Sequence, residues 1–119
     1  MDNNIAITID PKQNRIRFYR AFLKELGKPQ YVELMIDPEK KILAVKKGEA
    51  TLYYTAKLNS HVKKEHCYEL HCQNLIKELF KLLKWTDTNY SYKVIGTMDE
   101  VSQTAFFNLT TATKIDNEE

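Results

Sequence analysis

One helix pattern occurs twice in this chain of 119 residues, once in each half. Residues 22–26 read FLKEL and residues 75–79 read LIKEL, so apolar and charged side chains occupy the same places. In each half, a short strand-like segment precedes the pattern, and two strand-like segments separated by an aspartate-containing turn follow it. This order is typical of a duplicated unit, although a common helix pattern also recurs by chance. It predicts an α+β fold with two pseudo-repeated strand–helix–β-hairpin units packed into one compact domain.

The first unit, residues 1–48, carries strand, helix and turn signals. Apolar side chains alternate with polar or basic ones in its strands, which is the pattern of strands with one buried face. The helix ends where Gly27 and Pro29 follow it, and Asp37-Pro38 favours a type I turn between two strands. We expect strands at 5–9 and 15–18, a helix at 20–26, and a β-hairpin with strands at 31–36 and 41–45.

The rest of the chain divides into a connecting segment, a second unit and a tail. Apolar residues at helical spacing over 73–84 give the strongest helix prediction of the chain. We expect a connecting strand and loop at 49–66, a second helix–hairpin unit at 67–115 with strands at 90–97 and 102–113, and an acidic tail at 116–119.

Basic side chains are concentrated in the first unit. Residues 11–48 contain ten lysines and arginines against four acidic residues, a net charge of +6, although the whole chain carries only +2. All three arginines of the chain lie within this block, at positions 15, 17 and 20. Such a block is typical either of a phosphate-binding surface or of a solvated helix and strand face.

Residues 14–27, NRIRFYRAFLKELG, resemble the opening of the AbrB-type swapped-hairpin domain. That family's pattern is Gly-Arg-apolar-x-apolar-Pro, a short helix and then Leu-Gly at the same spacing, followed by a hairpin. The resemblance covers residues 14–46, and residues 5–10 fit as a leading strand. Asn14 stands in place of the family glycine, and Tyr19 stands in place of the family proline.

The resemblance implies a DNA-binding protein that acts as a dimer of interleaved chains. The MraZ cell-division regulators look like a duplicated version of this domain, which would accommodate both units of the present chain. Arg15 and Lys24 fall where the family has basic residues that contact DNA, and the charge of the block adds Arg17 and Arg20. An arginine fork can span two phosphate oxygens or a guanine edge, so either contact suits these side chains. We expect Arg15, Arg17 and Lys24 to lie exposed on one continuous basic face.

We therefore expect a non-enzymatic protein that binds double-stranded DNA, a small transcriptional regulator of AbrB/MraZ-like type that forms a homo-oligomer. The alternative is a protein-interaction or assembly module without nucleic-acid binding, which the small net charge and the acidic end of the chain favour. Aromatic residues in the predicted strands suit either base stacking or an ordinary core with cross-strand pairs.

Both cysteines and all three histidines lie between residues 61 and 72, but their spacing does not gather a zinc site. Cys67 and His71 share one face of a helix or of a strand, and neither geometry collects four ligands. A nucleophile at Cys67 or Cys72 would lack an orienting third group and an oxyanion loop. We therefore expect no catalytic residues, no metal and no cofactor.

The sequence also bears on the cellular compartment. No apolar run approaches the roughly 18 residues of a membrane-spanning helix, and residues 1–10 lack the basic and apolar regions of a signal peptide. Two cysteines are too few for a disulfide scaffold. We expect a cytoplasmic protein with reduced thiols and no membrane partner.

Overall fold

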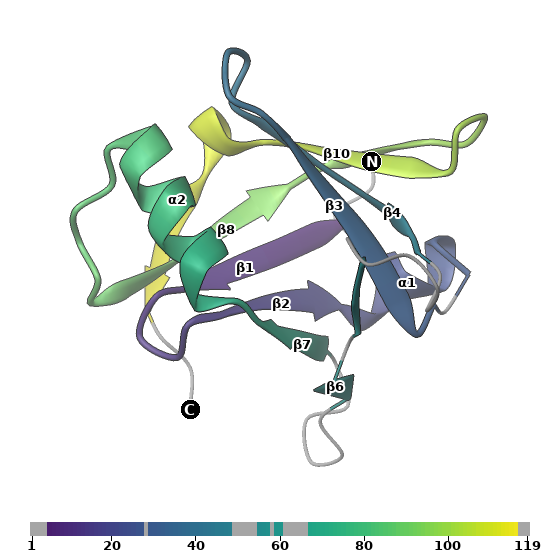
Figure 1. The fold of residues 1–119 in the computed structure, drawn as a ribbon, viewed down its shortest axis with the longest axis horizontal. Coiled ribbons are helices and arrows are strands. Elements are labelled where there is room, and N and C mark those ends of the chain that lie inside the picture. The colour runs from purple at the N-terminus through teal and green to yellow at the C-terminus, as the bar shows by residue number, and fades with distance from the viewer. Residues whose placement is uncertain (1–4, 28, 49–54, 58, 61–66, 117–119) are drawn as a thin grey trace.

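Two antiparallel sheets, one of six strands and one of five, form most of the structure (Figure 1). The computed structural model describes residues 5–27, 29–48, 55–57, 59–60 and 67–116. The strands of the six-stranded sheet are β1 (Ala6–Asp10), β2 (Arg15–Tyr19), β6 (Asn59–Ser60), β7 (Cys67–His71), β8 (Tyr90–Ile95) and β11 (Thr113–Asp116). The strands of the five-stranded sheet are β3 (Tyr31–Asp37), β4 (Ile42–Lys47), β5 (Thr55–Lys57), β9 (Thr97–Asp99) and β10 (Thr104–Asn108).

The order of strands joins the two halves of the chain. The six-stranded sheet runs β11-β8-β1-β2-β7-β6, and the five-stranded sheet runs β5-β3-β4-β10-β9. The helices among the described residues are α1 (Arg20–Glu25), α2 (Gln73–Leu83) and the short 3₁₀ helix η1 (Leu109–Thr111). The result is a compact domain with few helices, in which each sheet takes strands from both halves.

The first unit has the elements predicted for it. Strands β1 and β2, helix α1 and the hairpin β3–β4 follow in the expected order. The hairpin turn is held by Asp37, whose Oδ1 accepts the backbone N–H groups of Glu39 at 3.0 Å and Lys40 at 3.1 Å. Lys41 closes the turn with a positive φ of 57° and donates its N–H to the Asp37 carbonyl at 2.7 Å. This local chemistry explains why the sequence predicts the hairpin well.

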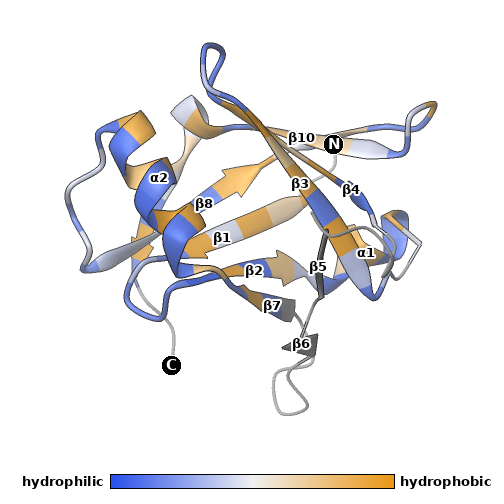
Figure 2. Ribbon diagram, viewed as in Figure 1, coloured by the Kyte–Doolittle hydropathy of each residue, from blue (hydrophilic) through white to orange (hydrophobic). Residues whose placement is uncertain are grey.

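Helix α2 confirms the helix predicted over 73–84. Its buried residues Ile76 and Leu79 face the core, and the helix ends at Lys84, whose backbone is left-handed with a φ of 59°. Figure 2 shows the two faces of α2, one hydrophobic and one hydrophilic. Apolar periodicity is enough to place such a helix.

The hairpin predicted from residues 90–97 and 102–113 is wrong in its pairing. Strand β8 pairs with β1 and β11 in the six-stranded sheet, and only the short strand β9 pairs with β10. The chain passes from one sheet to the other at Gly96, where a Cβ atom would lie 2.5 Å from the Phe106 carbonyl oxygen and 2.6 Å from the Phe107 ring. Glycine lets the backbone approach β10 this closely, and the strand therefore continues into the second sheet.

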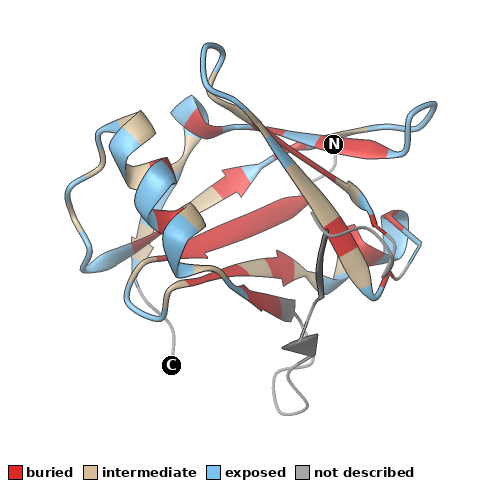
Figure 3. Cartoon of the chain, in the orientation of Figure 1, coloured by how far each residue is buried: buried red, intermediate tan, exposed pale blue. Residues whose placement is uncertain are grey.

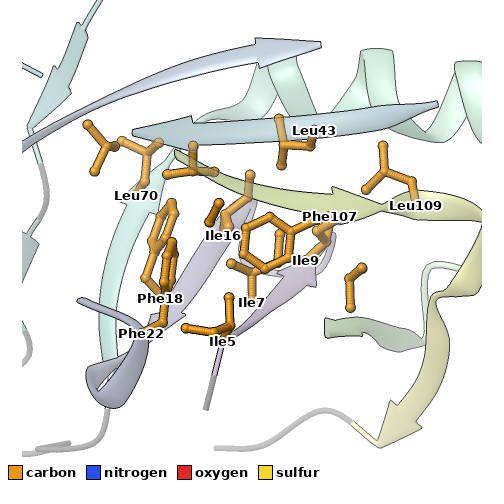
Figure 4. Packing of buried hydrophobic residues seen from close by; sticks show 14 of the residues in the cluster. Ile5, Ile7, Ile9, Ile16, Phe18, Phe22, Leu43, Leu70, Phe107 and Leu109 are labelled. Atoms are coloured by element: carbon orange, nitrogen blue, oxygen red, sulfur yellow. The ribbon is translucent and has the colours of Figure 1, made fainter. Parts of the chain in front are cut away.

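Apolar side chains from both sheets and both helices fill the space between the sheets (Figure 4). Strand β1 is buried along its whole length (Figure 3). Phe22 of α1 is fully buried, with its ring centroid 6.2 Å from that of Phe18 and 5.4 Å from that of Phe107. At the other end, Trp85 stacks on Tyr92 with ring centroids 4.2 Å apart. The core therefore depends on residues from both units.

The fold bears only in part on two further expectations, the absence of a membrane-spanning helix and the internal repeat. No helix among the described residues is long and apolar enough to cross a membrane. The internal repeat and its unit boundaries stay a prediction, because α1 is followed by a direct hairpin and α2 by strands in both sheets.

Replacing Gly96 with alanine tests the close approach of β8 to β10. The added Cβ meets backbone and ring atoms that are held by the core, so we expect Gly96→Ala to lower the free energy of unfolding by about 1–3 kcal/mol. Urea denaturation measures the change. Val101→Ala, at a residue that is 96% exposed, serves as the control and should change stability by less than about 0.5 kcal/mol. Equal stability of the parent and Gly96→Ala would contradict the packing described here.

Candidate functional site: the outer face of the six-stranded sheet

The six-stranded sheet has a core-facing side and an outer face that points away from the core. Ile7, Ile9 and Phe18 belong to the core, so the alternate residues of β1 and β2 project to the outer face. The register places Thr8 between Arg17 of β2 and Lys93 of β8 in one row of this face. The outer face is therefore polar and charged, and it contains two of the four predicted DNA contacts, at positions 15 and 17.

Arg15 is buried in an ion network on this face. Its Nε lies 3.0 Å from Oδ2 of Asp10, and its Nη1 donates to Oε2 of Glu69. Nε2 of His71 lies 3.3 Å from the other carboxylate oxygen of Glu69. Arg15, Asp10 and Glu69 are all buried, with relative exposures of 7%, 2% and 0%. Each buried charge thus faces an opposite charge, as the cost of desolvation requires.

The expectation that Arg15 lies on an exposed basic face is therefore wrong. Asp10 is its direct partner across the β1–β2 pair, and Glu69 of β7, whose direct cross-strand partner is Arg17, reaches Arg15 diagonally. Oδ1 of Asp10 also accepts the N–H groups of Lys12 at 3.1 Å and Gln13 at 3.2 Å, which fixes the β1–β2 turn. Arg15 holds three strands together, and its guanidinium is engaged inside the protein.

The other three predicted residues lie at the surface. Arg17 is half-buried on the outer face, and Arg20 and Lys24 are exposed on α1. Phe22 and Leu23 of the same helix are buried, so α1 is anchored on one side and presents basic side chains on the other. Arg20 and Lys24 share a helix face because they are four residues apart.

Lys93 is a basic residue of this face that the sequence analysis missed. It lies across Thr8 from Arg17, and its Nζ sits 5.2 Å from the centroid of the Tyr19 ring. The hydroxyl oxygens of Thr8 and Tyr19 lie 3.3 Å apart. Alternation of Lys93 with apolar neighbours indicates that it points outward, but its position beside Arg17 depends on the pairing of β8 with β1, which no local signal gives.

The cysteine and histidine cluster contributes no described metal site. Within the described residues, no group of three or more His, Cys, Asp or Glu side chains is arranged to hold a metal ion; His61 and His66 lie outside them. Burial raises the pKa of the Cys72 thiol to about 11, and the thiol donates to the Leu70 carbonyl at 3.4 Å. Cys72 is therefore protonated at neutral pH, which opposes a role as a nucleophile.

The five-stranded sheet has a different kind of outer face. Met35 of β3 and Phe106 of β10 lie on either side of Ala44 of β4 in one cross-strand row. Met35 is 40% exposed and Phe106 is 39% exposed. Beside the row, Lys46 Nζ lies 4.0 Å from Oε1 of Glu33. We call Met35, Ala44 and Phe106 the apolar row.

Comparison with known proteins gives no neighbour: no family model, no curated protein and no solved structure matches the chain. The resemblance to the AbrB/MraZ family therefore stays a prediction from the residues of the first unit.

Removing the Arg15 side chain tests the structural role assigned to it. Arg15→Ala leaves the buried carboxylates of Asp10 and Glu69 without their shared cation, so we expect a loss of about 3–5 kcal/mol in the free energy of unfolding. Chemical denaturation measures it, with Lys24→Ala as the control at under about 0.5 kcal/mol. A loss as small as that of the control would mean that Arg15 does not hold the sheet.

Proposed function

We propose that this is a non-enzymatic protein that binds double-stranded DNA, a small regulator of AbrB/MraZ-like type. The observation that carries the proposal is the run of basic residues Arg17, Arg20 and Lys24 along β2 and the start of α1, on the surface side of elements whose other side is anchored in the core. A rigid basic surface suits the phosphate backbone of DNA, because bound phosphates release counterions.

The arrangement of the first unit supports the proposal. Strand β2, the short helix α1 and the hairpin β3–β4 follow one another over residues 15–47, which is the order that the resemblance implies. The departure is Arg15, which the resemblance assigns to DNA contact and which is buried between Asp10 and Glu69. The proposed contact set is therefore Arg17, Arg20 and Lys24.

A duplicated unit is the second part of the proposal. The strands that lead into the two helices, β2 and β7, pair with each other in antiparallel fashion. The later strands β4 and β10 do the same in the other sheet. Antiparallel pairing of corresponding strands is what a two-fold relation between two units produces, and this supports the repeat predicted from residues 22–26 and 75–79.

Charge removal on the proposed contact set tests DNA binding. In Arg17→Gln/Arg20→Gln/Lys24→Gln, the slope of log K against log salt for duplex DNA should fall by about 2.7, at roughly 0.9 for each phosphate that is no longer neutralised. A matched control removes three exposed lysines, at positions 77 and 81 of α2 and at position 84 directly after it, and should leave most of the slope. Fluorescence anisotropy at several salt concentrations measures both, and circular dichroism checks the folds.

Two results would contradict the proposal. The first is a folded parent protein that shows no binding near 100 mM salt, where non-specific binders have Kd values of about 10⁻⁴–10⁻⁶ M. The second is an equal loss of slope in both triple variants, which would mean that DNA binding depends on the overall charge of the chain and not on β2 and α1.

The apolar row favours a second candidate function, an assembly module whose partner is a second copy of the chain. The outer face of an antiparallel sheet is normally polar, whereas Met35 and Phe106 expose large apolar side chains on either side of the small Ala44. An exposed apolar patch with a charged rim is typical of a protein interface.

Sedimentation equilibrium tests this second candidate. Under the assembly hypothesis the parent protein is a dimer, and Met35→Ser/Phe106→Ser shifts it to monomer because the interface no longer buries apolar side chains. Val101→Ser, at an exposed residue of the β9–β10 turn, is the control and should leave the dimer intact. A parent that stays monomeric at all accessible concentrations would contradict assembly through this face.

A further inference from the structure

Two neighbouring cross-strand pairs make the outer face of the five-stranded sheet complementary to itself. Glu33 of β3 pairs with Lys46 of β4, and Met35 of β3 pairs with Ala44 of β4 in the apolar row. All four side chains point away from the core, because the residues that alternate with them belong to it. Each pair thus joins complements: opposite charges in the first, and a bulky and a small side chain in the second.

The ion pair leaves both of its charges able to bind a further partner. Nζ of Lys46 lies 4.0 Å from Oε1 of Glu33, which is longer than a hydrogen bond between such groups. The Glu33 side chain is 15% exposed and the Lys46 side chain is 43% exposed. A carboxylate accepts several hydrogen bonds and an ammonium group has several to donate. A second pair of the same kind, placed against this one, would therefore satisfy both groups.

The apolar pair has a matching difference in size. Met35 is 40% exposed, whereas Ala44 beside it is 9% exposed and leaves a shallow position on the sheet. When two sheets pack face to face, their side chains interdigitate across about 10 Å, and large residues fit best against small ones. The flexible thioether of methionine adapts well to such a position. Met35 therefore fits a sheet that presents a small residue opposite it, as this sheet does at Ala44.

One two-fold axis satisfies both pairs at once. An axis parallel to the strands and midway between β3 and β4 places β3 of one copy over β4 of the other. Glu33 then faces Lys46 of the second copy, Met35 faces Ala44 of the second copy, and each contact occurs twice. An axis directly over β4 would instead bring Lys46 against Lys46 of the second copy, which like charges oppose. Charge and size thus favour the same axis.

We propose that a second copy of this chain binds the outer face of the five-stranded sheet through this axis, with two contacts between Glu33 and Lys46 that set the register. The proposal rests on the second candidate function, assembly, and adds to it the charged residues that determine the partner. The occupant is a second copy because the face complements itself in charge and in size. Phe106 lies one strand beyond β4, at the border of the contact.

Reversal of the charges tests the contact. Glu33→Lys and Lys46→Glu each bring like charges together at both symmetric contacts, so each should raise the Kd of the dimer about 100-fold, or about ten-fold for each repulsive contact. An equimolar mixture of the two variants should form a heterodimer, because both contacts again join opposite charges. Sedimentation equilibrium measures the Kd, and native mass spectrometry with one variant labelled with ¹⁵N distinguishes the heterodimer from homodimers.

Glu78→Lys and Lys81→Glu are the matched controls, because they make the same changes in net charge at exposed positions of α2. Each should keep the Kd of the parent dimer, and their mixture should show no preference for the heterodimer. An equally strong preference in the control mixture would mean that net charge directs the pairing, and it would overturn the proposal. Circular dichroism checks the fold of every variant.

The remaining outcomes separate this proposal from the assembly function. The axis proposed here is wrong, while assembly stands, if Met35→Ser/Phe106→Ser dissociates the parent dimer but both charge variants keep its Kd. The same holds if the two charge variants dissociate but their mixture gives no heterodimer. A parent that stays monomeric at all accessible concentrations would overturn both the assembly function and this contact.

Discussion

The buried guanidinium of Arg15 is the constraint on which the rest of the sheet depends. It contacts Asp10 of β1 and Glu69 of β7, and so joins three strands, one of which comes from the second half of the chain. A shift of one residue in the register of any of these strands would turn its charged side chain towards the core. Breaking a buried charge pair is costly, so the network selects this register among the alternatives. Fixing β2 against β7 also fixes where α1 and α2 begin.

This network decides which charges remain at the surface. Arg15 pairs with Asp10 and Glu69, and Glu69 also lies opposite Arg17 in the row that runs from Lys93 through Thr8. The basic surface therefore differs from the one predicted from the first unit. Arg15 is buried, and Lys93 of the second unit lies beside Tyr19. The charges of this face are therefore set by the pairing of the whole sheet.

Local chemistry explains which parts of the fold the sequence predicts. The β3–β4 turn follows from Asp37, and α2 follows from apolar residues at helical spacing, since each signal lies within a few residues of its effect. The burial of Arg15 depends on Glu69, which is far away in the sequence and arrives only through the pairing of β2 with β7. The bend at Gly96 likewise depends on contact with β10. Long-range pairing therefore accounts for the wrong expectations about Arg15 and the second hairpin.

The two proposed surfaces belong to different sheets and so are compatible. The sheets pack on one core, and their outer faces point away from each other. Association through the apolar row of Met35, Ala44 and Phe106 would leave the face with Arg17 and Lys93 open to solvent. Because the row lies on one face of a single sheet, two copies would meet there by a two-fold axis, which is the commonest symmetry of soluble dimers. Such a dimer would carry two copies of the face with Arg17 and Lys93. Under the proposed function, the salt dependence of DNA binding by such a dimer would report twice the contacts of one chain.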